Sequence, residues 1–139
     1  MKTAVLMILT GVASLLTVSC EKEENPYKNL SYEQLRTRIT ERYEEILLFA
    51  HPEACTDPDE WRLAEIMSVC GRGHIAYHGS VDEKKLQALI KDHNLLVEIY
   101  APMVAPVIDC MPYRQPIGIT CVDGEATVEY KPFDSAEQG

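Results

Sequence analysis

The fold is decided by the stretch Ile117-Gly118-Ile119-Thr120-Cys121-Val122-Asp123-Gly124-Glu125-Ala126-Thr127-Val128-Glu129-Tyr130. Two runs of β-favouring residues flank an Asp-Gly pair, which predicts a hairpin with a two-residue type I′ turn and so fixes the register. The expected pairs are Val122 with Glu125, Cys121 with Ala126, Ile119 with Val128, and Ile117 with Tyr130. In this register the apolar residues share one face, so the turn and the hydrophobic pattern agree.

Two helices are expected upstream of this hairpin. Ser31 and Gln34 have the spacing of a capping box, and the helix that they begin should end near Ala50, before Pro52. Asp82 can cap a second helix, which should end before Pro102. Both segments carry an apolar stripe at helical spacing, which indicates packing against a core.

A second hairpin is expected between the helices. Residues 61–66 and 74–78 are the β-favouring arms, and Cys70-Gly71-Arg72-Gly73 is the expected loop. We therefore predict an α+β domain over residues 30–131, with two helices packed on an antiparallel sheet of about four strands built from two hairpins. Two disulfides are expected to staple it.

The N-terminus has the pattern of an export signal. Lys2 precedes an apolar run over residues 4–16, and Ser19-Cys20 is followed by the acidic stretch 21–24. The run is shorter than the roughly 20 apolar residues of a membrane span, so it predicts a secretory peptide. The alternatives are a non-lipidated signal cut near Ser19 and a short anchor helix, since Thr17 stands where the usual lipoprotein signal has Leu.

These residues resemble a bacterial lipoprotein signal, and the acidic stretch resembles the surface-export signal of Bacteroidota lipoproteins. The resemblance implies a signal peptide at 1–19 and a lipid on Cys20. The polar residues around Pro26 predict an acidic tether at 20–29, and the lack of an apolar pattern predicts a flexible tail at 132–139. It also implies attachment to the outer membrane, on the cell surface, with the periplasmic face as the alternative. No other membrane contact than the lipid on Cys20 is expected.

Charge and cysteine number restrict the partners further. The 139 residues contain 13 Lys and Arg against 22 Asp and Glu, a net charge of −9, which argues against nucleic acid. Four cysteines remain after Cys20, and an even number in an exported chain predicts two disulfides. Of the three pairings, we predict Cys55 with Cys70 and Cys110 with Cys121, because each is local and a helix separates the two pairs.

The sequence predicts no metal site and no cofactor. No Cys-x-x-Cys occurs. His74 and His78 should share a strand face, but a spacing of about 13 Å along a regular strand keeps one ion from binding both. His93 falls on the apolar face of its helix, which predicts a core histidine.

A second resemblance covers residues 54–124. Its motifs are Ala54-Cys55-Thr56-Asp57, Glu60-Trp61, Cys70-Gly71, Ile75-Ala76-Tyr77, Val81-Asp82, Asp109-Cys110 and Cys121-Val122-Asp123-Gly124. Their order is similar to that of a small secreted domain of Bacteroidota lipoproteins. This resemblance implies no activity and no catalytic residue.

The functional expectation is a non-catalytic, surface-exposed lipoprotein that binds a protein or glycan partner, because enzyme signatures are absent from the sequence. The alternative is a secreted-protease inhibitor that presents Arg72 on the Gly71-Arg72-Gly73 loop, although flexible glycines disfavour tight binding. A hydrolase would need a cleft that joins an acid with a histidine. In the tail, Asp134-Ser135-Ala136 resembles the O-glycosylation acceptor motif of Bacteroidota, with Ser135 as the acceptor.

Overall fold

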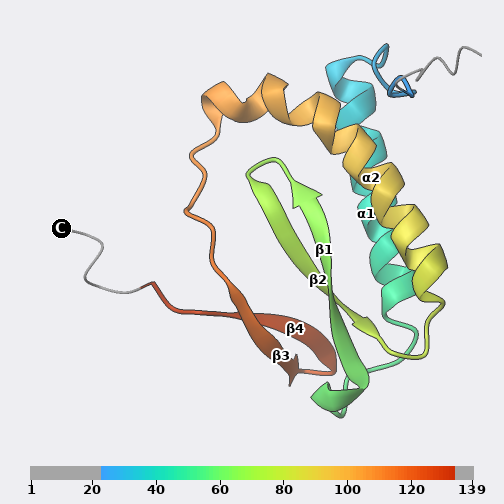
Figure 1. Cartoon of the computed structure of the whole chain (residues 1–139), viewed down its shortest axis with the longest axis vertical. Coiled ribbons are helices and arrows are strands. Elements are labelled where there is room, and N and C mark those ends of the chain that lie inside the picture. Colours follow the sequence, from blue (N-terminus) through green and yellow to red (C-terminus); the bar gives the residue numbers. More distant parts are fainter. Residues whose placement is uncertain (1–22, 134–139) are drawn as a thin grey trace, which may run out of the picture.

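The computed structural model describes residues 23–133. Its elements in chain order are α1 (Tyr32–Ala50), η1 (Pro58–Glu60), β1 (Trp61–Ser68), β2 (Gly71–His78), α2 (Glu83–Val104), η2 (Ala105–Val107), β3 (Pro116–Val122) and β4 (Glu125–Tyr130) (Figure 1). The predicted α+β class is confirmed, with two helices, two disulfides and two antiparallel hairpins, β1–β2 and β3–β4, each a two-stranded sheet. Among these residues no helix has the length and apolar character needed to cross a bilayer.

Both helix starts are confirmed. The Gln34 N–H donates to Ser31 Oγ at 3.3 Å and the Ser31 N–H donates to Gln34 Oε1 at 2.9 Å, which completes the capping box of α1. Asp82 accepts from the Lys85 N–H at 3.1 Å at the start of α2.

The predicted end of α2 was wrong, because the helix continues through Pro102 to Val104. A proline removes one helical hydrogen bond, but the Ala105 N–H still bonds the Ala101 carbonyl. Val104 is 4% exposed, so its burial helps to hold the additional turn.

The β1–β2 hairpin is longer than predicted. Its turn consists of Val69 and Cys70, and the strands pair without interruption from Trp61↔His78 to Ser68↔Gly71. Gly71 has φ +105°, a region that other residues rarely adopt, so a glycine is needed beside this turn. The predicted Cys70–Gly73 loop was therefore wrong: Gly71 to Gly73 belong to β2, and Arg72 pairs with Met67.

The β3–β4 turn is as predicted. Asp123 and Gly124 have φ of 50° and 81°, as a type I′ turn requires. Three of the predicted pairs are confirmed, namely Val122↔Glu125, Cys121↔Ala126 and Ile119↔Val128. The fourth was wrong, because Tyr130 pairs with Pro116 and the register shifts at Ile117, which is 62% exposed. A bulge places one extra residue opposite the partner strand, and here it turns Ile117 outward.

The β1–β2 hairpin lies between two layers. The helices α1 and α2 run side by side along it, and β3–β4 packs on its other side (Figure 1). Alternate residues of each strand face opposite layers, so both faces contribute to a core. The helix-side core consists of Ile46, Ala50, Ala64, Ile66, Ile75, Tyr77, Leu86 and Ile90. The disulfide-side core is smaller and consists of Cys55, Trp61, Ala76 and Ala126.

The predicted disulfide pairing was wrong. Cys55 is bonded to Cys121, and Cys70 to Cys110. The β3–β4 turn folds back on the loop after α1, where the Cys55 N–H donates to the Gly124 carbonyl at 2.7 Å. The β1–β2 turn lies near the C-terminal end of α2, so the chain leaving α2 passes Cys70. The helix α2 was expected to separate Cys55 and Cys70 from Cys110 and Cys121. Instead, each disulfide joins a cysteine that precedes α2 to one that follows it.

Candidate functional site

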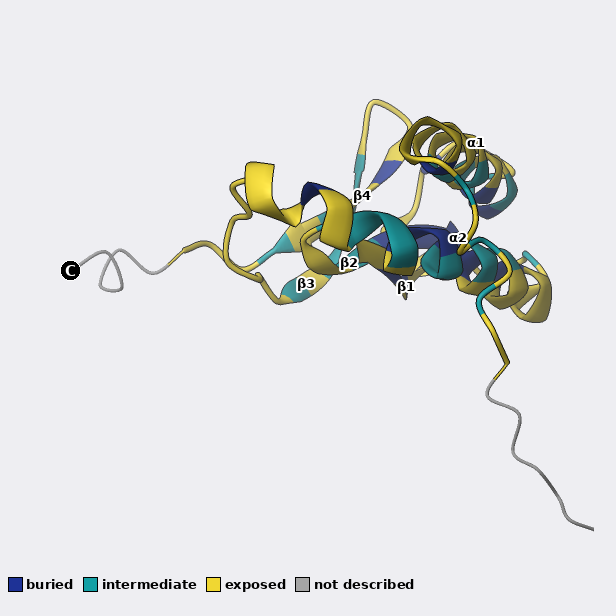
Figure 2. Cartoon of the chain, turned by 90° about the horizontal axis from the view of Figure 1, so that it is seen from above, coloured by how far each residue is buried: buried dark blue, intermediate teal, exposed yellow. Residues whose placement is uncertain are grey.

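Large apolar side chains are exposed along the last turn of α2 and the chain that follows it. Residues 101–117 contain four prolines and only two charged residues, Asp109 and Arg114, in a chain that is 25% charged. The exposed apolar residues of this segment are Met103, Val107, Ile108, Met111, Tyr113 and Ile117. Figure 2 shows the end of α2 and the chain after it largely in the colour of exposed residues. A contiguous group of exposed apolar side chains marks an interaction surface more often than a single exposed apolar side chain does.

Two cavities flank Arg72, which lies in β2 close to the turn of the β1–β2 hairpin. The larger, of about 580 Å³, lies between the hairpin tip and α2. Its lining is Glu65, Ile66, Met67, Ser68, Val69, Gly71, Arg72, Asn94, Glu98, Ala101 and Pro102. The smaller, of about 270 Å³, is lined by Cys70, Arg72, Met111, Pro112, Tyr113, Arg114, Tyr130 and Phe133. Arg72 lines both, so its side chain separates two adjoining hollows.

Contacts on both sides hold Arg72 in place. Its Nε lies 3.2 Å from Glu65 Oε2 on the neighbouring strand, and its guanidinium carbon lies 5.7 Å from the centre of the Tyr113 ring. The side chain is 59% exposed. Because Arg72 sits inside a paired strand, the premise of the inhibitor alternative, an arginine at a loop tip, was wrong.

Aromatic rings and a second arginine form the wall of the smaller cavity. The guanidinium carbon of Arg114 lies 5.1 Å from the ring centres of both Tyr130 and Phe133. His74 lies 6.1 Å from the ring centres of Tyr113 and Tyr130. Stacking of this kind limits the rotamers of the arginine before any partner arrives.

The disulfide Cys70–Cys110 ties the hairpin tip to the segment after α2. It joins the two segments that supply the exposed apolar and arginine side chains. We call the surface formed by Met67, Arg72, Met111, Tyr113, Arg114 and Phe133 the Arg72 surface.

The other histidines lie away from this surface. His93 is 4% exposed, as expected for a core histidine, and its burial lowers its pKa. The Nε2 atom of His51 lies 2.9 Å from the Ala76 carbonyl, and its ring meets Trp61 edge-on. His74 and His78 pair with Glu65 and Trp61, respectively. They are four residues apart on β2, so they lie on the same face of the strand, as predicted.

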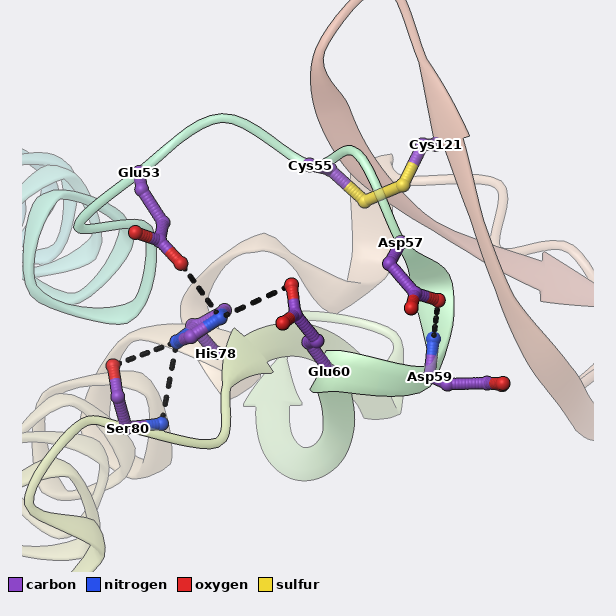
Figure 3. Close-up of polar contacts among 8 residues, drawn as sticks. All are labelled: Glu53, Cys55, Asp57, Asp59, Glu60, His78, Ser80 and Cys121. Atoms are coloured by element: carbon purple, nitrogen blue, oxygen red, sulfur yellow. Dashed lines mark hydrogen bonds and ion pairs between the residues drawn. A yellow bond between two sulfur atoms is a disulfide. The ribbon is translucent and has the colours of Figure 1, made fainter.

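His78 is the centre of a polar cluster that the sequence did not indicate (Figure 3). Its Nε2 lies 2.9 Å from Glu53 Oε1 and 3.8 Å from Glu60 Oε2. Its Nδ1 lies 2.6 Å from Ser80 Oγ and accepts from the Ser80 N–H at 3.2 Å. The pairing Trp61↔His78 brings Glu60, at the end of η1, beside the imidazole, whereas Glu53 reaches it from the loop after α1. A sequence separation of 25 residues between Glu53 and His78 leaves no local pattern that could have predicted this contact.

The order Ser80, His78, Glu53 is that of a nucleophile, a base and an orienting acid, so a hydrolytic role must be weighed. The backbone N–H of Ser80 already donates to the Nδ1 atom that would have to take the hydroxyl proton. Neither cavity beside Arg72 is lined by Ser80 or His78. The geometry therefore favours a cluster that positions the imidazole over one that activates Ser80.

Two of the residues singled out in the sequence, Cys20 and Ser135, lie outside the described residues. Their lipidation and O-glycosylation stay predictions. Comparisons with protein-family models, with curated proteins and with solved structures found no match for this chain.

Proposed function

We propose that this protein is an exported, lipid-anchored, non-catalytic module that binds a protein partner through the Arg72 surface. The observation that carries the binding role is the row of exposed apolar side chains beside Arg72 and Arg114. Met, Arg and aromatic residues are enriched in protein interfaces, whereas Lys and Glu are depleted there. The composition of the surface thus favours a protein partner over a glycan.

Rigidity supports the same role. The surface joins two segments through Cys70–Cys110, and three prolines, Pro106, Pro112 and Pro116, limit the freedom of the chain between α2 and β4. A surface that is already ordered loses less conformational entropy on binding. Its two arginines are held by neighbouring rings and by Glu65, so their positions are set in advance.

The anchor rests on the sequence around Cys20 and places the module on the outer membrane, facing outward, with the periplasmic face as the alternative. Wild-type protein should partition into detergent, and Cys20→Ala should leave it water-soluble or uncleaved. Protease added to intact cells should degrade the domain if it faces outward. Water-soluble wild-type protein would remove the anchor without affecting the binding role.

The binding role is tested by cross-linking on intact cells with a charge-bearing variant of the Arg72 surface, Met111→Asp/Tyr113→Asp. Both side chains are exposed, 73% and 55%, so the fold should tolerate the change. The matched control is Leu48→Asp, on α1, which is 79% exposed and lies outside the Arg72 surface. Wild type and the control should capture the same protein, and the double variant should lose it.

Other outcomes count against the proposal. Capture of the same protein by Met111→Asp/Tyr113→Asp would show that the Arg72 surface is not the binding site. Capture abolished by removing glycans from the partner would make the ligand a glycan. Sedimentation of wild type as a dimer that the double variant converts to a monomer would make the partner a second copy of this chain.

A further inference from the structure

We infer that Glu53, Glu60 and His78 form a binding site for a divalent transition-metal ion of the Zn²⁺ type. This site is separate from the proposed binding surface, because it lies at the other end of the β1–β2 hairpin. Seven residue steps separate Trp61↔His78 from Ser68↔Gly71 along each strand, and at about 3.3 Å per residue the two ends are roughly 23 Å apart.

The ligand atoms have suitable types and spacing. Carboxylate oxygens and an imidazole nitrogen are common ligands of zinc, and a site with three protein ligands keeps a position for water. The three atoms all lie within 4.8 Å of one another, and Nε2 is 2.9 and 3.8 Å from the two oxygens. Around a tetrahedral ion with ligand bonds of roughly 2.0–2.1 Å, neighbouring ligand atoms are about 3.3 Å apart. Shifts of up to about 1.5 Å, the largest between the two exposed carboxylates, would therefore close the site.

His78 presents a buried nitrogen with no hydrogen bond toward the two carboxylates. The residue is 8% exposed, and its Nε2 is buried without a hydrogen-bond partner. Glu53 Oε1 lies at a short distance but out of line for a hydrogen bond. The Trp61 ring meets the imidazole edge-on at 5.3 Å, which fixes the ring plane. Buried polar atoms are nearly always satisfied, so a buried nitrogen without a hydrogen bond that faces two carboxylates is suited to bind a cation between them.

The local charge also favours a cation. Residues 53–60 contain four acids, Glu53, Asp57, Asp59 and Glu60, and no Lys or Arg. Within residues 23–133, the ion pairs of Glu53 and Glu60 are with His78 alone. The two carboxylates are 59% and 55% exposed, so an ion and its water can reach them. A divalent ion would neutralise both charges at once.

Ser80 serves as the outer partner of the histidine. A metal-bound imidazole donates its other N–H to an acceptor, which orients the ring. Without the ion, the Ser80 N–H donates to Nδ1, so the proton of the neutral ring lies on Nε2. On binding, the ring proton moves to Nδ1 and is donated to Ser80 Oγ, 2.6 Å away. The Ser80 N–H then donates its hydrogen bond to water instead of to Nδ1, which is possible because Ser80 is exposed.

The test is titration of the chelator-treated protein with Zn²⁺, followed by calorimetry, and with Co²⁺, followed by its visible absorption. Wild type should bind one ion per chain, and Co²⁺ should give the spectrum of a coordinated rather than a hydrated ion. His78→Asn should weaken binding at least about 100-fold. Ser80→Ala should weaken it roughly 10- to 100-fold, as loss of an outer partner does.

His74→Asn is the matched control, because His74 shares the strand and the face of His78 but faces Tyr113 and Tyr130. It should bind Zn²⁺ like wild type. Glu53→Gln and Glu60→Gln should each weaken binding while the circular dichroism spectrum stays unchanged, which separates loss of a ligand from loss of the fold. Absence of saturable binding, or binding that survives His78→Asn, would overturn the inference.

Discussion

The two sides of the β1–β2 hairpin are stabilised in different ways. On the helix side, residues from both helices and both strands form a continuous apolar core, in which Ile46 and Leu86 are fully buried. On the other side, the buried cluster is half the size, and one of its members is the disulfide cysteine Cys55. The flanking residues Ile119 and Val128 are only partly buried.

This difference indicates where covalent bonds are needed. A small exported domain that buries little apolar surface gains stability from disulfides, which restrict the unfolded chain. Both disulfides hold the chain after α2, one at the hairpin β3–β4 and one at Cys110. The same region carries the Arg72 surface, so exposed apolar side chains are held in place without burying them.

The largest effect should follow removal of the disulfide with the longer loop. Cys55→Ala/Cys121→Ala opens a bridge between residues 66 apart, which the chain-entropy model values at about 4 kcal/mol. Cys70→Ala/Cys110→Ala, with a separation of 40, should cost about 0.4 kcal/mol less. Urea unfolding of the three proteins measures both values.

Hydrogen exchange would show where each loss is felt. In Cys55→Ala/Cys121→Ala, amides of β3 and β4 should exchange first, while those of α1 and α2 keep their protection. Uniform loss of protection across the domain would mean that the two sides fold as one unit and that the contrast between them is unfounded.

The second largest effect should come from a cavity in the helix-side core, which is larger and better buried than the disulfide-side core. Leu86→Ala leaves a cavity at a fully buried position, and we expect a loss of about 3 kcal/mol in the free energy of unfolding. Leu48→Ala, at 79% exposure on α1, should change it by less than about 0.5 kcal/mol. Ile119→Ala, on the disulfide side, should cost less than Leu86→Ala because its side chain is only partly buried. Equal costs for Leu86 and Ile119 would contradict the difference between the two cores.

The smallest effect concerns pH. Burial lowers the pKa of His93 in the folded protein, so below the ordinary value of about 6.5 the unfolded chain binds more protons than the folded one. Stability contributed by neutral His93 is therefore complete above that pH and declines as the pH falls toward the lowered value. Urea unfolding at two pH values on either side of 6.5 should give a smaller difference for His93→Phe, which keeps a ring beside Tyr43. An unchanged difference would assign the pH dependence to other groups.

Local signals in the sequence predicted the elements, and contacts between distant residues could not be predicted. Ser31, Asp82 and Asp123-Gly124 act within four residues, so the helix starts and the β3–β4 turn were predicted correctly. The glycines around Arg72 were misread as a loop, because only strand pairing shows that Gly71 alone adjoins the turn. The disulfide partners depend on how α2 directs the chain, which composition does not reveal.

The candidate sites follow the same division. The segment 101–117, with few charges and four prolines, is visible in the sequence, and its prolines indicate an irregular, exposed chain. The cluster of Glu53, Glu60 and His78 is not visible, because three elements bring its members together. Packing of separate elements, rather than spacing along the chain, creates that cluster.

The central claim is that the two disulfides hold the β3–β4 hairpin and the Arg72 surface in place. The connectivity of the four cysteines tests this claim most directly. Cleavage after Lys and Arg without reduction places the four cysteines on separate peptides, residues 43–62, 63–72, 92–114 and 115–139. Mass spectrometry should find 43–62 joined to 115–139 and 63–72 joined to 92–114. A peptide that joins 43–62 to 63–72, or one that joins 92–114 to 115–139, would contradict the account.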